Sequence, residues 1–222
     1  MKKIIAMLRV QVFVFGPFQE NTYVLYDESK EAVIIDPGCY EESEKTELTE
    51  FVRSNQLKVM MLLNTHCHID HVLGNAFVRQ TYNIKLHIHR NDEPVLKAVR
   101  VYAPNYGFHL YQEASADAYL AEGDEVAFGH QKFKVLFVPG HSPGHIVFYN
   151  EKEKIVIGGD VLFKNSIGRT DLPGGDADTL INSIHQKLFT LPDDVTVFPG
   201  HGPSTTIGFE KVSNPFCGLT SN

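Results

Sequence analysis

Six consecutive residues constrain this chain more than any other part of it. Residues 66–71 follow the pattern H-x-H-x-D-H and place His66, His68, Asp70 and His71 directly after the apolar residues 59–63. A short apolar run of this kind predicts a buried strand. The four side chains then lie just beyond the carboxyl end of that strand, where a loop can gather ligands. One catalytic metal needs three protein ligands and an open position, so four candidates within six residues indicate more than one metal.

The composition restricts the class of protein. The chain has 222 residues, of which 43% are hydrophobic, so it can bury a sizeable core, and we expect one domain over residues 1–222. The formal net charge of -7 argues against a nucleic-acid partner, because nucleic-acid binders carry a basic surface. The three cysteines form no C-x-x-C pair, which fits a reducing compartment. No apolar stretch is long enough to span a bilayer. We therefore expect a cytoplasmic protein without membrane contact.

Apolar runs between turn residues predict mostly strands. Strands are expected at residues 9–15, 22–26, 32–35, 59–63, 85–89, 125–128, 132–138, 146–149, 154–157 and 195–198. Helical spacing of apolar residues predicts helices within residues 41–55, 72–77, 95–99 and 180–188. The predicted strands form two groups along the sequence, and a predicted helix follows each group. This order favours an α+β fold in which two packed β-sheets carry helices on their outer faces.

Three later residues complete the pattern begun by the first run. His141, Asp160 and His201 each follow an apolar run and stand among glycines and prolines. Glycine permits tight backbone turns and proline stiffens them. Such loops aim one side chain and keep their neighbours out of the way.

In this order, the H-x-H-x-D-H run, His141, Asp160 and His201 resemble the metallo-β-lactamase superfamily. The early turn Asp36-Pro37-Gly38 is similar to that superfamily's aspartate turn, and the match runs from about residue 10 to residue 205. The resemblance implies a four-layer αββα sandwich of two mixed sheets, with metals at one edge between the sheets.

Carried over by position, the resemblance implies two metal sites that share one ligand. The first site would use His66, His68 and His141, the second Asp70, His71 and His201, and Asp160 would bridge them. Imidazole and carboxylate suit two divalent cations, with zinc expected and iron or manganese as alternatives. We also expect Asp70 to orient the attacking water. Two cations outweigh the ligand carboxylates, so an anionic small-molecule substrate is expected.

The ligand set resembles the glyoxalase II branch of the superfamily, which hydrolyses thioesters of glutathione. Residues 159–163 and 168–176 are similar to the short bacterial proteins of that branch. Full-length glyoxalase II carries a helical C-terminal domain, whereas only 21 residues (222 − 201) follow His201 here. Arg169 is a candidate for binding a substrate carboxylate, and an ion pair with Asp171 or Asp176 is the alternative.

Three other functions stay open at this point. A persulfide dioxygenase with a single iron shares the fold and much of the ligand run. A lactonase or phosphodiesterase would use the same two-metal chemistry, and a metal-stabilised scaffold would use none.

Several further residues have possible roles near the site or in packing. His145 either orients a ligand or packs, and Asp36 is expected to support the site rather than bind metal. His87 and His89 are expected to be structural. Four aromatic residues in the irregular segment after residue 90 either roof the site or pack in the core; they are Tyr102, Tyr106, Phe108 and Tyr111.

Overall fold

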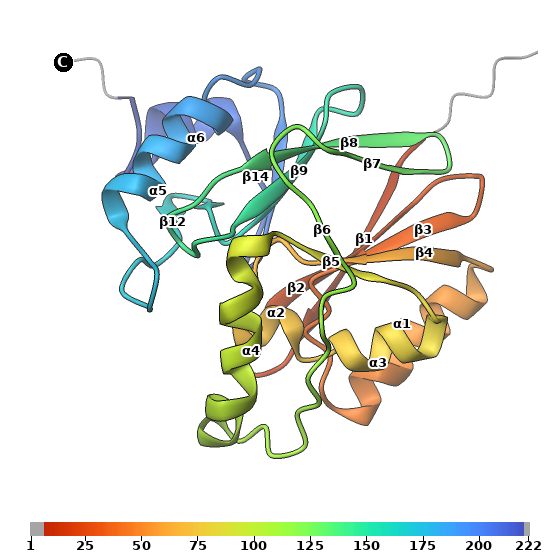
Figure 1. Cartoon of the computed structure of the whole chain (residues 1–222). Helices are drawn as coiled ribbons and strands as arrows, with labels where there is room; N and C mark the ends of the chain where they lie inside the picture. The colour runs from red at the N-terminus through yellow and green to blue at the C-terminus, as the bar shows by residue number, and fades with distance from the viewer. Residues whose placement is uncertain (1–6, 220–222) are drawn as a thin grey trace, which may run out of the picture.

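Two β-sheets packed face to face form the centre of the computed structural model, which describes residues 7–219 (Figure 1). The first sheet has the strand order β1-β2-β3-β4-β5-β6. Its strands are β1 (Arg9–Phe15), β2 (Glu20–Tyr26), β3 (Glu31–Ile35), β4 (Lys58–Leu63), β5 (Leu86–Ile88) and β6 (Ala118–Tyr119). Neighbouring strands are antiparallel from β1 to β3 and parallel from β3 to β6.

The second sheet has the order β14-β13-β10-β9-β8-β7 and is also mixed. Its strands are β7 (Glu125–Phe128), β8 (Gln131–Phe137), β9 (Ile146–Asn150), β10 (Ile155–Gly159), β13 (Thr196–Pro199) and β14 (Thr205–Thr206). Here β10 and β13 are parallel and the other pairs are antiparallel. A short hairpin of β11 (Leu162–Phe163) and β12 (Ser166–Ile167) lies outside both sheets.

Side chains that alternate along the strands build separate apolar layers. On β2, Tyr23 and Leu25 belong to the cluster between the sheets, together with Phe148 of the second sheet. Val24 faces the other way and packs with Leu48 of α1 (Glu42–Ser54). Every residue of β2 is buried, because both faces of this sheet are covered. This explains why the second half of the strand, residues 23–26, is continuously apolar rather than alternating.

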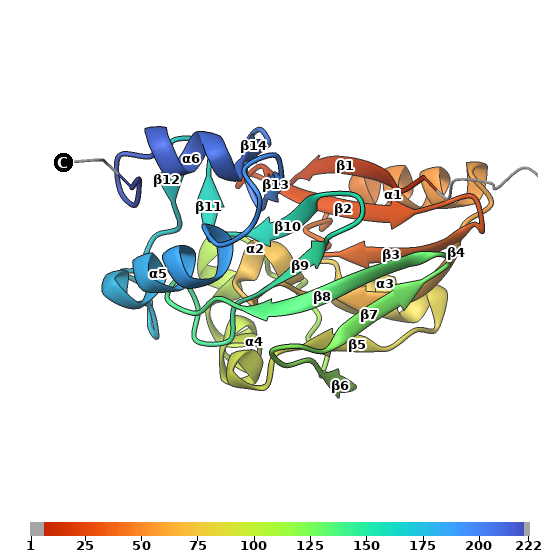
Figure 2. The ribbon, with the colours of Figure 1, turned by 90° about the horizontal axis from the view of Figure 1, so that it is seen from above.

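Helices cover the outer face of each sheet. The helices α1, α3 (Asn75–Tyr82) and α4 (Glu93–Tyr102) pack on the first sheet, and α5 (Ala177–Ser183) and α6 (Ile207–Ser213) pack on the second. Figure 1 shows the two helical layers on opposite sides of the strands, and in Figures 1 and 2 alike β7 and β8 lie over β3 and β4. The predicted four-layer αββα sandwich is thus confirmed.

The helix predicted after the H-x-H-x-D-H run is two helices, α2 (Ile69–Val72) and α3, with Gly74 between them. A Cβ atom on Gly74 would lie 2.5 Å from Sγ of Cys39 and 2.9 Å from the carbonyl oxygen of Pro37. The amide of Gly74 donates to that carbonyl at 2.7 Å. The close approach of the Asp36-Pro37-Gly38 turn therefore interrupts the helix.

The predicted helix near the C-terminus also differs in detail, since α5 continues into a π-helical turn over Ile184–Leu188. Within residues 7–219, no helix has both the length and the apolar character that crossing a membrane requires. The strands β3, β4, β8, β10 and β13 end near the same edge of the sandwich, and the loops that follow them carry the candidate ligands.

Candidate metal centre

The first group of candidate ligands joins the loop after β4 to the loop after β8. His66, His68 and His141 are all buried. Nε2 of His141 lies 2.8 Å from Nδ1 of His68 and 3.2 Å from Nε2 of His66. The three ring nitrogens lie within 4.8 Å of one another. Three nitrogen atoms at this spacing can hold one cation.

The second group joins α2 to the loop after β13. Oδ2 of Asp70 lies 3.1 Å from Nε2 of His201 and 3.8 Å from Nε2 of His71. These three ligand atoms also lie within 4.8 Å of one another. Asp70 and His71 are adjacent residues in α2, whereas His201 arrives from the opposite sheet. The structure thus assembles the second group from both halves of the sandwich.

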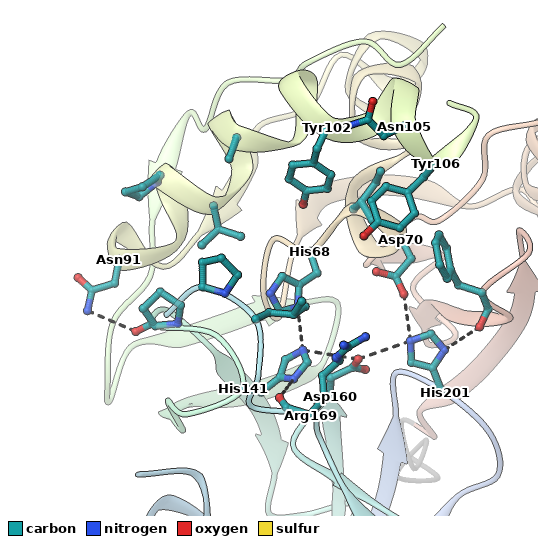
Figure 3. A pocket seen from close by; sticks show the side chains of 18 of the residues that line it. His68, Asp70, Asn91, Tyr102, Asn105, Tyr106, His141, Asp160, Arg169 and His201 are labelled. Atoms are coloured by element: carbon teal, nitrogen blue, oxygen red, sulfur yellow. Dashed lines mark hydrogen bonds and ion pairs between the residues drawn. The ribbon is translucent and has the colours of Figure 1, made fainter. Parts of the chain in front are cut away.

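Asp160 lies between the two groups. Its Oδ1 is 3.4 Å from Nε2 of His71, and its Oδ2 is 3.5 Å from Nε2 of His201 and 3.6 Å from Nε2 of His141. Its carboxylate therefore contacts both groups, which is the position that a bridging ligand between two cations requires. Figure 3 shows Asp160 between His141 and His201.

The second ring nitrogen of three histidines is occupied by a hydrogen-bond partner. Nδ1 of His141 lies 2.8 Å from the carbonyl oxygen of Arg169, and Nδ1 of His201 lies 3.1 Å from that of Phe18. Nδ1 of His71 lies 3.2 Å from Oδ2 of Asp36. A carbonyl or carboxylate oxygen accepts a proton from Nδ1, so the Nε2 lone pair is left for a metal.

Two buried atoms at the centre of the cluster lie 3.4 Å apart and otherwise have no hydrogen-bond partner within residues 7–219. They are Nε2 of His71 and Oδ1 of Asp160. A buried polar atom without a partner is costly unless something else satisfies it. Nitrogen and carboxylate donors that converge in this way fit two divalent cations.

The pKa values of the histidines separate the two groups. Burial, with the neighbouring imidazoles, lowers the pKa of His66 well below its usual value and that of His68 to about 3. These residues are therefore neutral near pH 7, which is the form that binds metal. Burial disfavours the imidazolium of His201 as well, but hydrogen bonds to Asp160 and Asp70 outweigh it and raise its pKa to about 10. In the second group, a cation would therefore displace protons that balance the two carboxylates.

Asp36 supports the centre from behind. Its Oδ1 accepts a hydrogen bond from the amide of Thr65 at 2.7 Å, and its Oδ2 accepts one from the hydroxyl of Thr65 at 2.5 Å. The same Oδ2 faces Nδ1 of His71. Oδ1 of Asp36 is thus committed to the loop after β4 and Oδ2 is shared with His71, in keeping with the expected supporting role.

Glu20 is a second buried carboxylate behind His71, and the sequence did not single it out. Its Oε1 lies 3.9 Å from Nδ1 of His71 and has no hydrogen-bond partner within residues 7–219. Burial raises the pKa of Glu20 well above its usual value, although His71 opposes this shift. The hydroxyl of Thr22 donates to its other oxygen at 2.8 Å.

Asp92, at the start of α4, ties the two loops of the first group together. One carboxylate oxygen accepts the amide of Cys67 at 2.7 Å. The other accepts the hydroxyl of Ser142 and the amide of Gly144, each at 2.6 Å. The sequence gives no signal for this residue, because its partners lie 25, 50 and 52 positions further along or back in the chain.

His145 contacts the backbone of Asp160, the proposed bridging ligand, and so helps to orient that residue. Its Nε2 accepts a hydrogen bond from the backbone amide of Asp160 at 3.0 Å. Its ring also stacks on that of His66, with centroids 4.7 Å apart and planes 17° apart. Of the two interpretations of this residue, the structure therefore shows both a positioning contact and packing.

A cavity of about 1050 Å³ opens directly onto both groups. Arg169 lines it, but its guanidinium forms two hydrogen bonds with Asp171, both 2.7 Å long. The ion pair with Asp171 is thus present, and the backbone carbonyl of Arg169 is the part that contacts His141 (Figure 3).

The four aromatic residues after residue 100 divide between the two roles considered for them. Tyr102 and Tyr106 line the cavity and stand over the ligands (Figure 3). Phe108 is buried in the first apolar cluster, and Tyr111 packs against that cluster. Outside the cavity, the ring of His89 stacks on Phe137 with centroids 4.5 Å apart.

Comparison with known proteins places this geometry in a family. The model of the metallo-beta-lactamase superfamily matches residues 15–201. A curated relative from Haemophilus influenzae, hydroxyacylglutathione hydrolase GloC, is 36% identical over 211 residues, covering 94% of this chain and 98% of the relative.

Two solved structures are similar over nearly the whole chain. The protein TTHA1623, solved in a di-iron-bound form, has a TM-score of 0.83 and 36% identity, covering 93% of this chain and 100% of that one. The BLEG-1 B3 metallo-beta-lactamase has a TM-score of 0.82 and 38% identity, covering 95% of this chain and 99% of that one. The chain therefore belongs to the metallo-β-lactamase superfamily and is a metal-binding hydrolase of that fold.

Proposed function

We propose that this protein is a two-metal hydrolase that cleaves an anionic thioester such as an S-acylglutathione. The observation that carries the proposal is the position of the Asp160 carboxylate, within 3.6 Å of His141, His71 and His201. The name of the relative GloC supports the thioester, and the di-iron form of TTHA1623 supports two metals.

The residues of this chain would divide the work between them. The two groups, together with Asp160, would hold the cations beside the cavity. When bound, such cations supply Lewis-acid polarisation of a carbonyl and activate water near neutral pH. Asp70 lines the cavity with a partly exposed side chain, so it is placed to accept a hydrogen bond from the attacking water and hold it in line with the carbonyl carbon.

No nucleophilic side chain of the protein enters this scheme. Cys67 lies between two ligands, but it is fully buried and burial raises the pKa of its thiol well above the usual value. A buried, protonated thiol is a poor nucleophile. Direct attack by water therefore accounts for the reaction without a covalent intermediate.

Zinc is the proposed native metal, with iron as the alternative that the di-iron neighbour favours. Elemental analysis of the purified protein should give two metals per chain.

The metal-loaded protein should hydrolyse S-lactoylglutathione. Replacing His66 or Asp160 by alanine should lower kcat/KM about 100-fold or more, because metal assistance is worth several kcal/mol.

His109→Ala is the matched control, because His109 is exposed and outside both groups; its turnover should be unchanged. Full turnover in the Asp160→Ala variant would refute the proposal. Oxygen uptake with glutathione persulfide would instead indicate the dioxygenase.

Hydrolysis of a β-lactam is a second candidate, which the name of the structural neighbour BLEG-1 favours. It would need the same ligands and the same cavity. A chromogenic cephalosporin assayed beside the thioester separates the two, since the larger kcat/KM identifies the better substrate.

A further inference from the structure

We propose that the cavity beside the metal centre selects thioesters with a bulky apolar acyl group, and that one face of α4 binds this group. The inference rests on the proposed function and names its substrate class. It starts from the spacing of Pro94, Ala98 and Tyr102, which recur every four residues and line the cavity together with Val95. Residues four apart lie on one face of a helix.

This helix face stays apolar although it is open to the cavity. Val95 and Tyr102 are half-buried and also pack against the first apolar cluster. Pro94 and Ala98 are exposed, so core packing does not account for the apolar character of these two residues. Elsewhere on α4, Lys97 and Arg100 are exposed and charged. An apolar strip inside a cavity is typical of a ligand-binding wall.

The apolar surface begins at the reacting centre itself. Ile69 lies between the ligands His68 and Asp70 in the sequence, and Pro143 lies two residues beyond His141; both line the cavity. The acyl chain is attached directly to the carbon that is attacked, so it must lie within a few bonds of the ligands. The part of the thioester that meets this surface is therefore the acyl group, and the thiol carrier extends outward.

The side chains of the cavity wall offer little positive charge for binding the acyl part of the substrate. Among the described residues that line the cavity, Arg169 is the one lysine or arginine, and Asp171 already pairs with its guanidinium. The cavity volume of about 1050 Å³ is at the upper end of the roughly 300–1,000 Å³ of pockets for drug-sized ligands, so it has room for an acyl group longer than lactoyl beside part of the thiol carrier. Recognition through apolar area explains both features.

The test measures hydrolysis of N-acetylcysteamine thioesters with acetyl, butyryl, hexanoyl, octanoyl and phenylacetyl groups. This carrier is small and neutral, so only the acyl group varies. The value of kcat/KM should rise about twofold to fourfold per added methylene, as expected for burial of apolar area. Equal or falling values along the series would overturn the inference.

Two variants of α4 locate the effect. Ala98→Glu should lower the ratio of kcat/KM for the octanoyl thioester to kcat/KM for the acetyl thioester about tenfold or more. Val101→Glu is the matched control, because Val101 is 74% exposed on the same helix and does not line the cavity. Equal effects of the two variants on the octanoyl thioester would contradict the assigned wall.

A binding measurement separates this inference from the proposed function. Calorimetry with S-methylglutathione and S-octylglutathione, which cannot be hydrolysed, should show the octyl compound binding at least about tenfold more tightly, and Ala98→Glu should abolish the difference. If no thioester is hydrolysed, the proposed function fails, and the calorimetry still decides the apolar wall. If thioesters are hydrolysed but the two thioethers bind equally, the wall fails and the function stands.

Discussion

At the scale of single residues, Asp92 shows how the ligand loops are held in register. Its carboxylate accepts three hydrogen bonds, from Cys67 on one loop and from Ser142 and Gly144 on the other. All three partners donate, so a carboxylate satisfies them and an amide does not. Burial also raises the pKa of Asp92, although these three bonds oppose the shift.

Asp92→Asn should therefore separate His66 and His68 from His141. The NH₂ group of the new amide would face one of the hydrogen-bond donors that now donate to Asp92, and we expect a loss of about 1–3 kcal/mol in the free energy of unfolding. Metal affinity should fall about 10-fold to 100-fold, as for other partners that orient ligands. Competition with a chelator measures the affinity.

Asp117→Asn is the control for Asp92→Asn. Asp117 pairs with Arg79, and neither residue lines the cavity, so the Asp117→Asn variant should bind metal as the unaltered protein does. Unchanged affinity in Asp92→Asn would show that α4 does not position the first group.

The candidate ligands could be named from the sequence, whereas their supports could not. Four candidate ligands can be recognised because they lie within six residues of one another, namely His66, His68, Asp70 and His71. The other three can be recognised because each follows an apolar run, namely His141, Asp160 and His201. Asp92 and Glu20 act through contacts between loops that only folding brings together. A single buried carboxylate has no periodicity or spacing that reveals its partners.

At the scale of secondary structure, Gly74 lies between α2 and α3 and packs tightly against residues 37 and 39. There is no room for a side chain, since a Cβ would lie 2.5 Å from Sγ of Cys39 and 2.9 Å from a backbone oxygen. The turn at Asp36-Pro37-Gly38 therefore packs directly against the end of α2, the helix that carries Asp70 and His71.

Gly74→Ala should cost about 1–3 kcal/mol of unfolding free energy, the usual range for overpacking in a tight core. Chemical denaturation measures the change. Thr81→Ala, at an exposed position of α3, should stay within about 0.5 kcal/mol of the parent protein. A Gly74→Ala protein as stable as the Thr81→Ala protein would mean that the turn yields to the new methyl group.

Strands of three or more residues were predicted from the sequence, including the short β5, β7 and β13, whereas strands of two residues were not. The strands β1, β2, β3, β4, β8, β9 and β10 each contain several apolar residues in a row or in alternation, and all were expected. The two-residue strands β6, β11, β12 and β14 are too short to show any period. The helix α6 was missed because its buried positions are few, namely Ile207 and Glu210.

At the scale of the whole molecule, the metal centre joins two halves. His66, His68, Asp70 and His71 follow the first sheet, whereas His141, Asp160 and His201 follow the second. Protein contacts alone already link these edges. The amide of Asn21 donates to the carbonyl of Gly200 at 2.7 Å, and its side chain donates to those of Pro199 and Gly202, both at 2.9 Å.

Metal removal should therefore weaken the whole sandwich rather than one loop. Ligands that bind only the folded state stabilise it by about 2.7 kcal/mol at a hundredfold excess over Kd. For a chain of this length, that corresponds to a fall in Tm of roughly 5–10 °C after chelation. Hydrogen exchange should become faster at residues 64–72, 139–145 and 199–202 together, because both sheets lose the cations that link them.

Asp160→Ala is the informative comparison: without the proposed bridging ligand, chelation should shift the Tm of this variant by much less. A Tm that ignores chelation in the parent protein would mean that Asn21 and its neighbours hold the two halves together without help from the cations.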